Sequence, residues 1–242
     1  MLSWSLPKYY NRRIVRAIAE FELIEENDNI IVGFSGGKDS AFLVYALAIL
    51  KEHLGVEFDL RALTVDLGFK EDKDYTRLKQ FCSKLEVEYD IKKTEIAESI
   101  LTENQPCAKC AYFRKGVMTN YCQDYGFNKI AFGHHYDDAV ETFLMSILYS
   151  GQLKTLQPRR FLSETRIEII RPLIYLRESI IVDEIKKRNI NYINEIINCD
   201  DVMNLILKSK SRKKALIIDE IESITSTTSK KNIMFILKTN EI

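Results

Sequence analysis

Two apolar periodicities alternate along residues 8–188, and this alternation limits the folds open to the chain more than any other feature. Short runs of β-branched and aromatic residues are typical of buried strands, and apolar residues that recur every three to four positions are typical of helices. The predicted strands are residues 30–34, 58–66, 87–94, 129–133 and 166–170, and the predicted helices are residues 8–26, 39–53, 74–85, 110–125, 137–149 and 178–188. Strands that alternate with helices pair in parallel through crossover connections. The pattern therefore predicts a doubly wound α/β fold, with a mainly parallel five-stranded sheet and helices on both faces.

The periodicity also predicts how the chain is organised. Residues 1–28 form an N-terminal helical segment, and residues 29–190 contain all the predicted strands. From residue 191 the sequence is rich in asparagine and lysine, and a helical pattern returns only at residues 213–224. We expect residues 191–242 to form a loop and a small helical appendage.

The charge balance excludes a generally basic protein. Lysine and arginine together number 35, as do aspartate and glutamate, so any contact with nucleic acid depends on local clusters. Three basic clusters occur: Lys8, Arg12, Arg13 and Arg16; Lys154, Arg159 and Arg160; and Lys208, Lys210, Arg212, Lys213 and Lys214. Such clusters either bind phosphates or are ordinary solvated surface charges.

The expected location is the cytoplasm. The N-terminal residues lack the apolar run of a signal peptide, and no apolar stretch is long enough to span a bilayer, so no membrane contact is expected. In a reducing compartment the five cysteines are expected to serve metal binding, catalysis or packing rather than disulfides. Cys82 and Cys122 lie within apolar helical patterns and are expected to be buried packing residues.

A glycine-containing loop follows the first predicted strand and leads into a helix. It consists of Ser35, Gly36, Gly37, Lys38, Asp39 and Ser40. In open α/β sheets this position presents backbone amides and a helix N-terminus to an anionic ligand, and Lys38 and Ser40 add further donors. The simpler alternative is a tight strand-to-helix turn. Because a lysine and serines accompany the glycines, we interpret the loop as a phosphate-binding loop, although its spacing is not that of a Walker motif.

Further polar residues end two other predicted strands at the same edge of the sheet. Asp66 ends the second strand and is a candidate contact for a ribose or a magnesium ion. After the fourth strand come Gly133, His134, His135, Asp137 and Asp138. One of the two carboxylates is a candidate magnesium or nucleotide ligand, whereas the other is as well explained as a favourable charge at a helix N-terminus.

Three cysteines are candidate metal ligands. Cys107 and Cys110 have a Cys-x-x-Cys spacing, and Cys199 lies in the C-terminal segment. Three thiolates without an evident fourth ligand favour an iron–sulfur cluster with one open iron. Zinc remains the alternative, with His134 or His135 as the fourth ligand. Arg114, one helical turn after Cys110, is expected to face the same cavity.

The loop Ser35–Ser40 resembles the pyrophosphatase loop, or PP-loop, of the N-type ATP pyrophosphatases. The resemblance implies an adenine nucleotide alpha hydrolase-like fold, in which ATP is split into AMP and pyrophosphate and the AMP is placed on a substrate. The implied ATP-binding residues are Ser35, Gly36, Gly37, Lys38, Asp39, Ser40, Asp66, Gly133 and His134. The implied catalytic residues are Lys38, Asp39, Asp137 and Arg114, with magnesium at Asp137 and Asp138.

Within that superfamily, the chain resembles the cluster-dependent tRNA 2-thiocytidine synthetases over about residues 8–220. The shared segments are Glu25-Glu26-Asn27-Asp28, Ser35–Ser40, Cys107-x-x-Cys110 with Phe113-Arg114-Lys115-Gly116, Gly133-His134-His135 with Asp137-Asp138, Glu141-Thr142-Phe143, Ile170-Arg171-Pro172-Leu173 and Arg177-Glu178. The resemblance implies a [4Fe–4S] cluster on Cys107, Cys110 and Cys199, sulfur transfer to cytidine 32 of tRNA and a homodimer. It also implies a sulfur donor, which would be a cysteine desulfurase or free sulfide.

Several functions fit these residues. The first is tRNA thiolation, with tRNA bound by Arg12, Arg13, Lys210, Arg212 and Lys213. The second keeps the adenylating loop but thiolates or amidates another tRNA base or a small molecule. The third is a non-catalytic module that senses a nucleotide or a metal. A tRNA lysidine synthetase is a further relative, which does not require the three cysteines.

Overall fold

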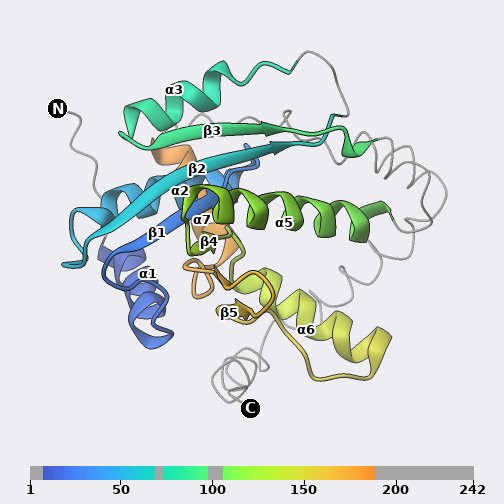
Figure 1. Cartoon of the computed structure of the whole chain (residues 1–242). Coiled ribbons are helices and arrows are strands. Elements are labelled where there is room, and N and C mark those ends of the chain that lie inside the picture. Colours follow the sequence, from blue (N-terminus) through green and yellow to red (C-terminus); the bar gives the residue numbers. More distant parts are fainter. Residues whose placement is uncertain (1–7, 69–72, 98–105, 189–242) are drawn as a thin grey trace. The chain divides into compact units, whose positions relative to one another are not determined.

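The computed structural model describes residues 8–68, 73–97 and 106–188 (Figure 1). The described residues fall into two units, and each is described by itself. The first contains residues 8–135 and 158–188, apart from the two gaps, and the second contains residues 136–157.

The first unit contains α1 (Lys8–Glu20), α2 (Lys38–Lys51), α3 (Thr76–Lys84), α5 (Pro106–Tyr125) and α7 (Glu178–Arg188). Its strands are β1 (Asp28–Gly33), β2 (Phe58–Asp66), β3 (Glu88–Lys93), β4 (Lys129–Ala131), β5 (Arg159–Leu162) and β6 (Ile167–Ile170).

The six strands form one sheet in the order β3-β2-β1-β4-β6-β5. All neighbours pair in parallel except β5 and β6, which are antiparallel. The chain adds β2 and β3 on one side of β1 and then places β4 on the other side. Ligands of open α/β sheets bind beyond the carboxyl ends of the strands at such a reversal. The α/β fold class is confirmed, and the end of β1 is the position at which to look for a site.

The structure adds one strand to the five that were predicted. β5 is an edge strand whose burial does not alternate as it does in a half-buried strand, and it contains Arg159 and Arg160. Short charged edge strands are common in natural sheets because they discourage pairing with another chain. Their charges also remove the apolar pattern by which a strand is predicted.

Two predicted helix boundaries also differ from the structure. The first helix ends at Glu20 rather than at residue 26, because Glu22 and Asn27 adopt positive φ angles of 49° and 64° and turn the chain into β1. The helix expected to begin at residue 110 begins at Pro106, a position that proline favours because its missing N–H has no partner in the first turn. Cys107 therefore lies inside this helix, as Cys110 does.

Helices cover both faces of the sheet. α5 crosses one face in Figure 1, where Met118 and Cys122 pack with Ile31, Leu63 and Ile130. α2 and α7 lie on the other face (Figure 1), and α2 is buried almost all round, as its continuous apolar sequence requires. Cys82 and Cys122 are fully buried, and burial raises the pKa of each thiol to about 12. Their predicted role as packing residues is confirmed.

Two aromatic contacts attach the outer helices of the first unit. The Arg188 guanidinium of α7 lies 5.4 Å from the centre of the Tyr45 ring on α2. Arg13 of α1 donates from Nη1 to the carbonyl oxygen of Tyr175 at 3.3 Å, and the Arg16 guanidinium lies over the Tyr175 ring. α7 is therefore fixed to the helix that follows the glycine loop.

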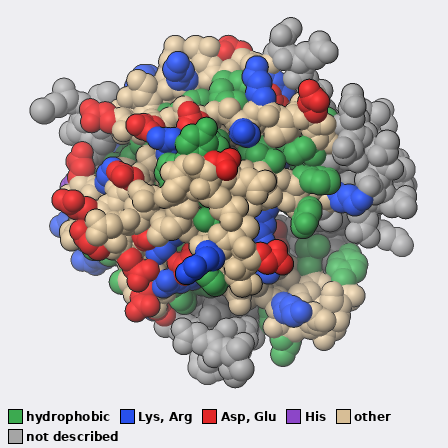
Figure 2. All heavy atoms as spheres, viewed as in Figure 1, with side chains coloured by type: hydrophobic (Ala, Val, Ile, Leu, Met, Phe, Trp, Pro, Cys, Tyr) green, Lys and Arg blue, Asp and Glu red, His purple; other side chains and the backbone are tan. Residues whose placement is uncertain are grey.

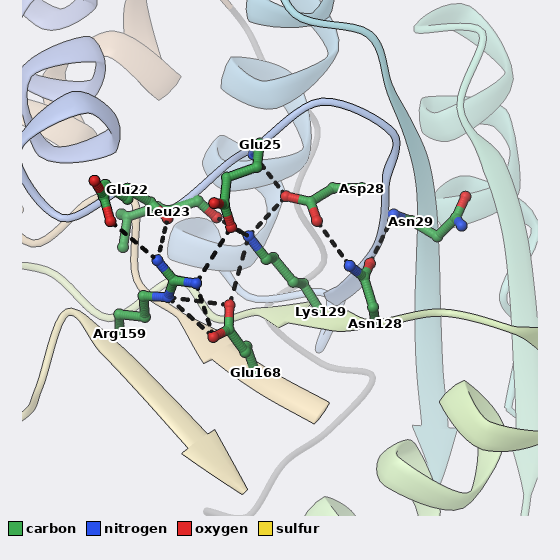
Figure 3. A network of polar contacts seen from close by, with 9 residues as sticks. All are labelled: Glu22, Leu23, Glu25, Asp28, Asn29, Asn128, Lys129, Arg159 and Glu168. Carbon is green, nitrogen blue, oxygen red and sulfur yellow. Dashed lines mark hydrogen bonds and ion pairs between the residues drawn. The ribbon is translucent and has the colours of Figure 1, made fainter. Parts of the chain in front are cut away.

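A network of charged residues around the buried Lys129 joins the opposite, amino-terminal edge of the sheet (Figure 3). The side chain of Lys129 is 2% exposed. Its Nζ atom lies 2.7 Å from a carboxylate oxygen of Asp28, 3.0 Å from one of Glu25 and 3.5 Å from one of Glu168. Arg159 binds Glu168 and Glu25 in the same network and donates to the carbonyl oxygen of Glu22 at 3.0 Å. These contacts connect β4, β5 and β6 to the segment that enters β1.

The second unit contains α6 (Tyr136–Ser150) and the residues after it. The Oγ1 atom of Thr155 donates to the carbonyl oxygen of Ala139 at 2.6 Å, which folds the segment back along the helix. None of the helices in the described part of the chain has the length and apolar content needed to cross a membrane. The expected boundaries at residues 28 and 190 stay a prediction, and the C-terminal appendage lies outside the described residues.

Candidate nucleotide-binding site

The loop between β1 and α2 is organised by its own hydroxyl groups. Ser40 donates from Oγ to the carbonyl oxygen of Gly37 at 2.9 Å and accepts from the Ser35 amide at 3.2 Å. The two serine oxygens are 3.0 Å apart, and the Gly37 amide donates to the Ser35 hydroxyl. Gly36 has a φ of 83°, which favours glycine. The loop is therefore held in shape by contacts within itself.

The helix that follows leaves its first amides available for an anion. Its N-cap is Gly37, which has no side chain to cap the helix. The first amides of a helix have no partner within the helix, and the aligned peptide dipoles place partial positive charge there. This is the geometry expected of a phosphate-binding loop.

Two side chains from neighbouring strands, the buried Thr64 and the partly buried Tyr89, support the start of the loop. Thr64 of β2 donates from Oγ1 to the carbonyl oxygen of Phe34 at 2.6 Å, and the Tyr89 hydroxyl of β3 donates to Thr64 at 3.0 Å. The Phe34 ring also lies against those of Phe81 and Tyr89. This support was not predicted from the sequence, although a threonine within the apolar run of residues 62–65 was a signal for it.

Lys38 and two carboxylates form an ion cluster at the start of α2. The Nζ atom of Lys38 lies 2.9 Å from Asp39 Oδ2 and 2.7 Å from Glu178 Oε1. Burial lowers the pKa of Lys38, but its hydrogen bonds to Glu178 and Asp39 outweigh burial, so the pKa is raised overall. The same hydrogen bond from Lys38 lowers the pKa of Glu178. No local pattern predicts this contact, because it joins residues 140 positions apart, and Glu178 stood out in the sequence only through the family resemblance.

The end of β4 lies directly against this loop. A Cβ atom at Gly133 would come within 2.9 Å of the Asp39 carbonyl group and 3.0 Å of the Ser40 amide nitrogen. His135 is buried, and its Nε2 atom lies 3.9 Å from Asp39 Oδ1. The His134 ring contacts Phe132 edge to face. The structure thus brings Gly133 and His135 to the loop, as the shared sheet edge predicts.

Asp66 lies at the end of β2, where its carboxylate organises the next loop. Its Oδ1 atom accepts from the Gly68 amide at 3.0 Å and from Lys73 Nζ at 2.9 Å. Burial raises the pKa of Asp66, but these hydrogen bonds outweigh burial and the pKa is lowered overall. Asp66 is therefore held as an anion, and its contact with a ribose or a metal stays a prediction.

One predicted cluster ligand has a described side chain. Cys110 is buried in α5, and its Sγ atom lies 3.7 Å from Nη2 of Arg114, as the spacing of one helical turn predicts. The side chain of Cys107 and the whole of Cys199 lie outside the described residues. Among the residues that are described, no group of three or more His, Cys, Asp or Glu side chains is placed to hold a metal.

The remaining predicted residues are spread over the chain. Asp137 and Asp138 occupy the first turn of α6, in the second unit. Arg12 is exposed on α1, whereas Arg13 is partly buried by its contact with Tyr175. The third basic cluster, with Lys210, Arg212 and Lys213, lies outside the described residues. On the face seen in Figure 2, acidic and basic side chains are interspersed, in keeping with the balanced charge.

Comparisons with known proteins place this geometry in a family. The model of a PP-loop domain family matches residues 8–204. The tRNA-cytidine(32) 2-sulfurtransferase of Geobacter metallireducens is 39% identical over 170 residues, which cover 69% of this chain and 66% of that protein. The protein of the same name from Geobacter sulfurreducens is 37% identical over 182 residues, which cover 72% of this chain and 69% of that protein. The chain thus spans about two thirds of the length of these relatives.

A solved structure agrees with the fold. The U34-tRNA thiolase NcsA from Methanococcus maripaludis, determined with its [4Fe-4S] cluster, matches with a TM-score of 0.62 and 20% identity. The match covers 90% of this chain and 78% of that one, and at this identity it shows the fold alone. By the match over residues 8–204 and the identity to these curated transferases, this chain belongs to the PP-loop family that includes the tRNA-cytidine(32) 2-sulfurtransferases.

Proposed function

We propose that this chain is an ATP-dependent and iron–sulfur-dependent tRNA sulfurtransferase, which converts cytidine 32 of the anticodon loop into 2-thiocytidine. The observation that carries the proposal is the self-organised loop Ser35–Ser40 at the topological switch of the sheet, in a chain whose relatives are named for this reaction. The names of the relatives support the choice of tRNA cytidine as the substrate, and the loop supports its activation by ATP.

The loop accounts for the activation step. The free amides of α2 and the Lys38 ammonium bind the β- and γ-phosphates of ATP, so that the bond between the α- and β-phosphates is the one that breaks. The carbonyl oxygen at C2 of the cytidine attacks the α-phosphate, and pyrophosphate leaves. Sulfide then attacks C2, and AMP leaves with the original oxygen. The carbonyl oxygen becomes a good leaving group only once it has been adenylated.

The residues on α5 fit an iron–sulfur cluster beside this chemistry. Cys107, Cys110 and Cys199 would hold the cluster, which would supply the iron chemistry for the transfer of sulfur. The fit rests on Cys110, whose buried sulfur has the Arg114 guanidinium beside it. The Arg114 guanidinium would balance part of the negative charge of the thiolates and the cluster.

The other partners follow from the same proposal. Magnesium would be held by Asp137 and Asp138. Arg12 and Arg13 on α1, with Lys210, Arg212 and Lys213, would bind tRNA phosphates. The sulfur donor would be a cysteine desulfurase or free sulfide, and the enzyme would act in the cytoplasm as a homodimer.

The test is a thiolation assay with anaerobically purified full-length protein. Unmodified tRNA is incubated with ATP, magnesium and sulfide, and its nucleosides are analysed by mass spectrometry. We expect 2-thiocytidine together with AMP and pyrophosphate. Lys38→Ala should lower the rate by about a hundredfold or more, since that is the effect of removing a single hydrogen-bond donor to a transition state.

Metal analysis tests the cluster in the same preparation. Cys110→Ala should lower the iron and labile sulfide content sharply, whereas Cys122→Ala, which removes a buried packing thiol, should leave the iron content unchanged. Release of ADP and phosphate by the wild type, or transfer of sulfur to a small molecule only, would contradict the proposed function. Stoichiometric zinc without labile sulfide would contradict the cluster.

A further inference from the structure

Lys38 has a partner from outside its own loop. Glu178, the first residue of α7, places Oε1 2.7 Å from Lys38 Nζ, a shorter distance than that to the adjacent Asp39. The side chains are 29% exposed for Lys38 and 48% exposed for Glu178, so a ligand reaching the loop from solvent also has access to this pair.

The packing of α7 fixes the position of Glu178. Ile181 and Ile185 of this helix are buried, and Arg188 at its other end lies over Tyr45 of α2. Glu178 therefore reaches Lys38 from a fixed helix. His135 also faces Glu178 closely enough to contribute to its electrostatic environment.

The ion cluster has an electrostatic consequence. One ammonium and two carboxylates give the cluster of Lys38, Asp39 and Glu178 a net charge of −1. Phosphate oxygens that bind Lys38 must therefore share its ammonium with carboxylates already in place. The loop amides are not affected in this way, because their dipoles remain directed toward the ligand.

We propose that Glu178 is a positioning residue that acts through Lys38. It holds the ammonium beside the loop before the nucleotide binds, and it competes with pyrophosphate for that ammonium after the reaction, so that the product is released. The inference rests on the proposed function, since it assigns pyrophosphate as the product on this loop. Glu178 thus weakens product binding without touching the reacting atoms.

The test measures pyrophosphate binding by calorimetry, with the full chain and magnesium at a fixed concentration. Glu178→Gln removes the competing charge and should tighten pyrophosphate binding about two- to fivefold, the range expected for a partly exposed ion pair. The control is Asp183→Asn, which removes the same charge from an exposed position on the same helix and should leave the affinity unchanged.

A double-mutant cycle decides whether the effect passes through Lys38. In a Lys38→Met background, Glu178→Gln should no longer tighten binding, because the shared ammonium is gone. Glu178→Asp, which keeps the carboxylate, should restore an affinity between those of the wild type and Glu178→Gln.

Three results would overturn the inference. These are weaker or unchanged binding in Glu178→Gln, equal tightening in Asp183→Asn, and an undiminished effect in the Lys38→Met background. The measurement uses neither tRNA nor sulfide. Failure of the thiolation assay would therefore contradict the proposed function without altering this result, and the two failures are distinguishable.

Discussion

At the scale of single residues, Gly133 controls how closely the end of β4 approaches the glycine loop. An alanine Cβ there would lie 2.9 Å from the Asp39 carbonyl group, which is backbone and cannot rotate away. Overpacking of this kind costs about 1–3 kcal/mol, so Gly133→Ala should displace the loop and weaken ATP binding by roughly tenfold. Equilibrium binding of ATP measures the effect.

Gly116→Ala is the matched control for this substitution. Gly116 lies within α5, and outside the backbone of its own helix no other described atom lies within 4 Å of the position that an alanine Cβ would occupy. Alanine is favoured over glycine in a helix, so this variant should keep its ATP affinity and gain up to about 1 kcal/mol of stability. Equal ATP affinity in Gly133→Ala and the wild type would show that ATP binding does not depend on the close approach of Gly133 to the loop.

At the scale of elements, the Lys129 network holds the amino-terminal ends of β4, β5 and β6 to the segment before β1. Lys129→Met would leave the buried carboxylate of Asp28 without its cation, whereas Glu25 and Glu168 would keep their contacts with Arg159. Breaking a buried ion pair by removing one partner costs about 3–5 kcal/mol. Urea denaturation should show a loss of this size in the free energy of unfolding.

The exposed pair of Lys51 and Asp59 provides the comparison. These side chains are 44% and 76% exposed, so Lys51→Met should cost less than about 1 kcal/mol. If Lys129→Met costs no more than Lys51→Met, the network does not hold these strands together.

At the scale of the whole molecule, the paired carboxylates predict sensitivity to acid. Hydrogen bonding to Lys129 lowers the pKa of Glu25, and hydrogen bonding to Lys38 lowers that of Glu178. The pKa of Asp66 is also lowered overall, because its hydrogen bonds outweigh burial. A lowered pKa in the folded state gives stability that is present above the ordinary value, 4.5 for Glu and 3.8 for Asp, and is lost as the pH falls through the folded value.

The free energy of unfolding attributable to these three groups should therefore stay constant from pH 7 to about pH 5 and fall below about pH 4.5. Urea denaturation at a series of pH values measures it. Glu25→Gln removes one of the three groups, so its stability should fall less steeply with acid than that of the wild type. A variant with the same acid dependence as the wild type would exclude Glu25 as a contributor.

The sequence alone determined the order of strands and helices and the position of the glycine loop, because both depend on residues close together in the chain. Apolar periodicity identified β1, β2, β3, β4 and β6, and the predicted burial of Cys82 and Cys122 followed from the same patterns. The neighbourhood of Cys110 and Arg114 was also predictable, since it needs only the pitch of one helix.

Only the tertiary structure decided which residues far apart in the chain come into contact. The contacts of Lys38 with Glu178, of Thr64 with Phe34 and of Lys129 with Asp28 join residues 140, 30 and 101 positions apart. No local pattern encodes such a pairing, because it depends on strand order and helix packing. β5 could not be predicted from a local pattern either, since a charged segment becomes a strand only when the edge of β6 is present to pair with it.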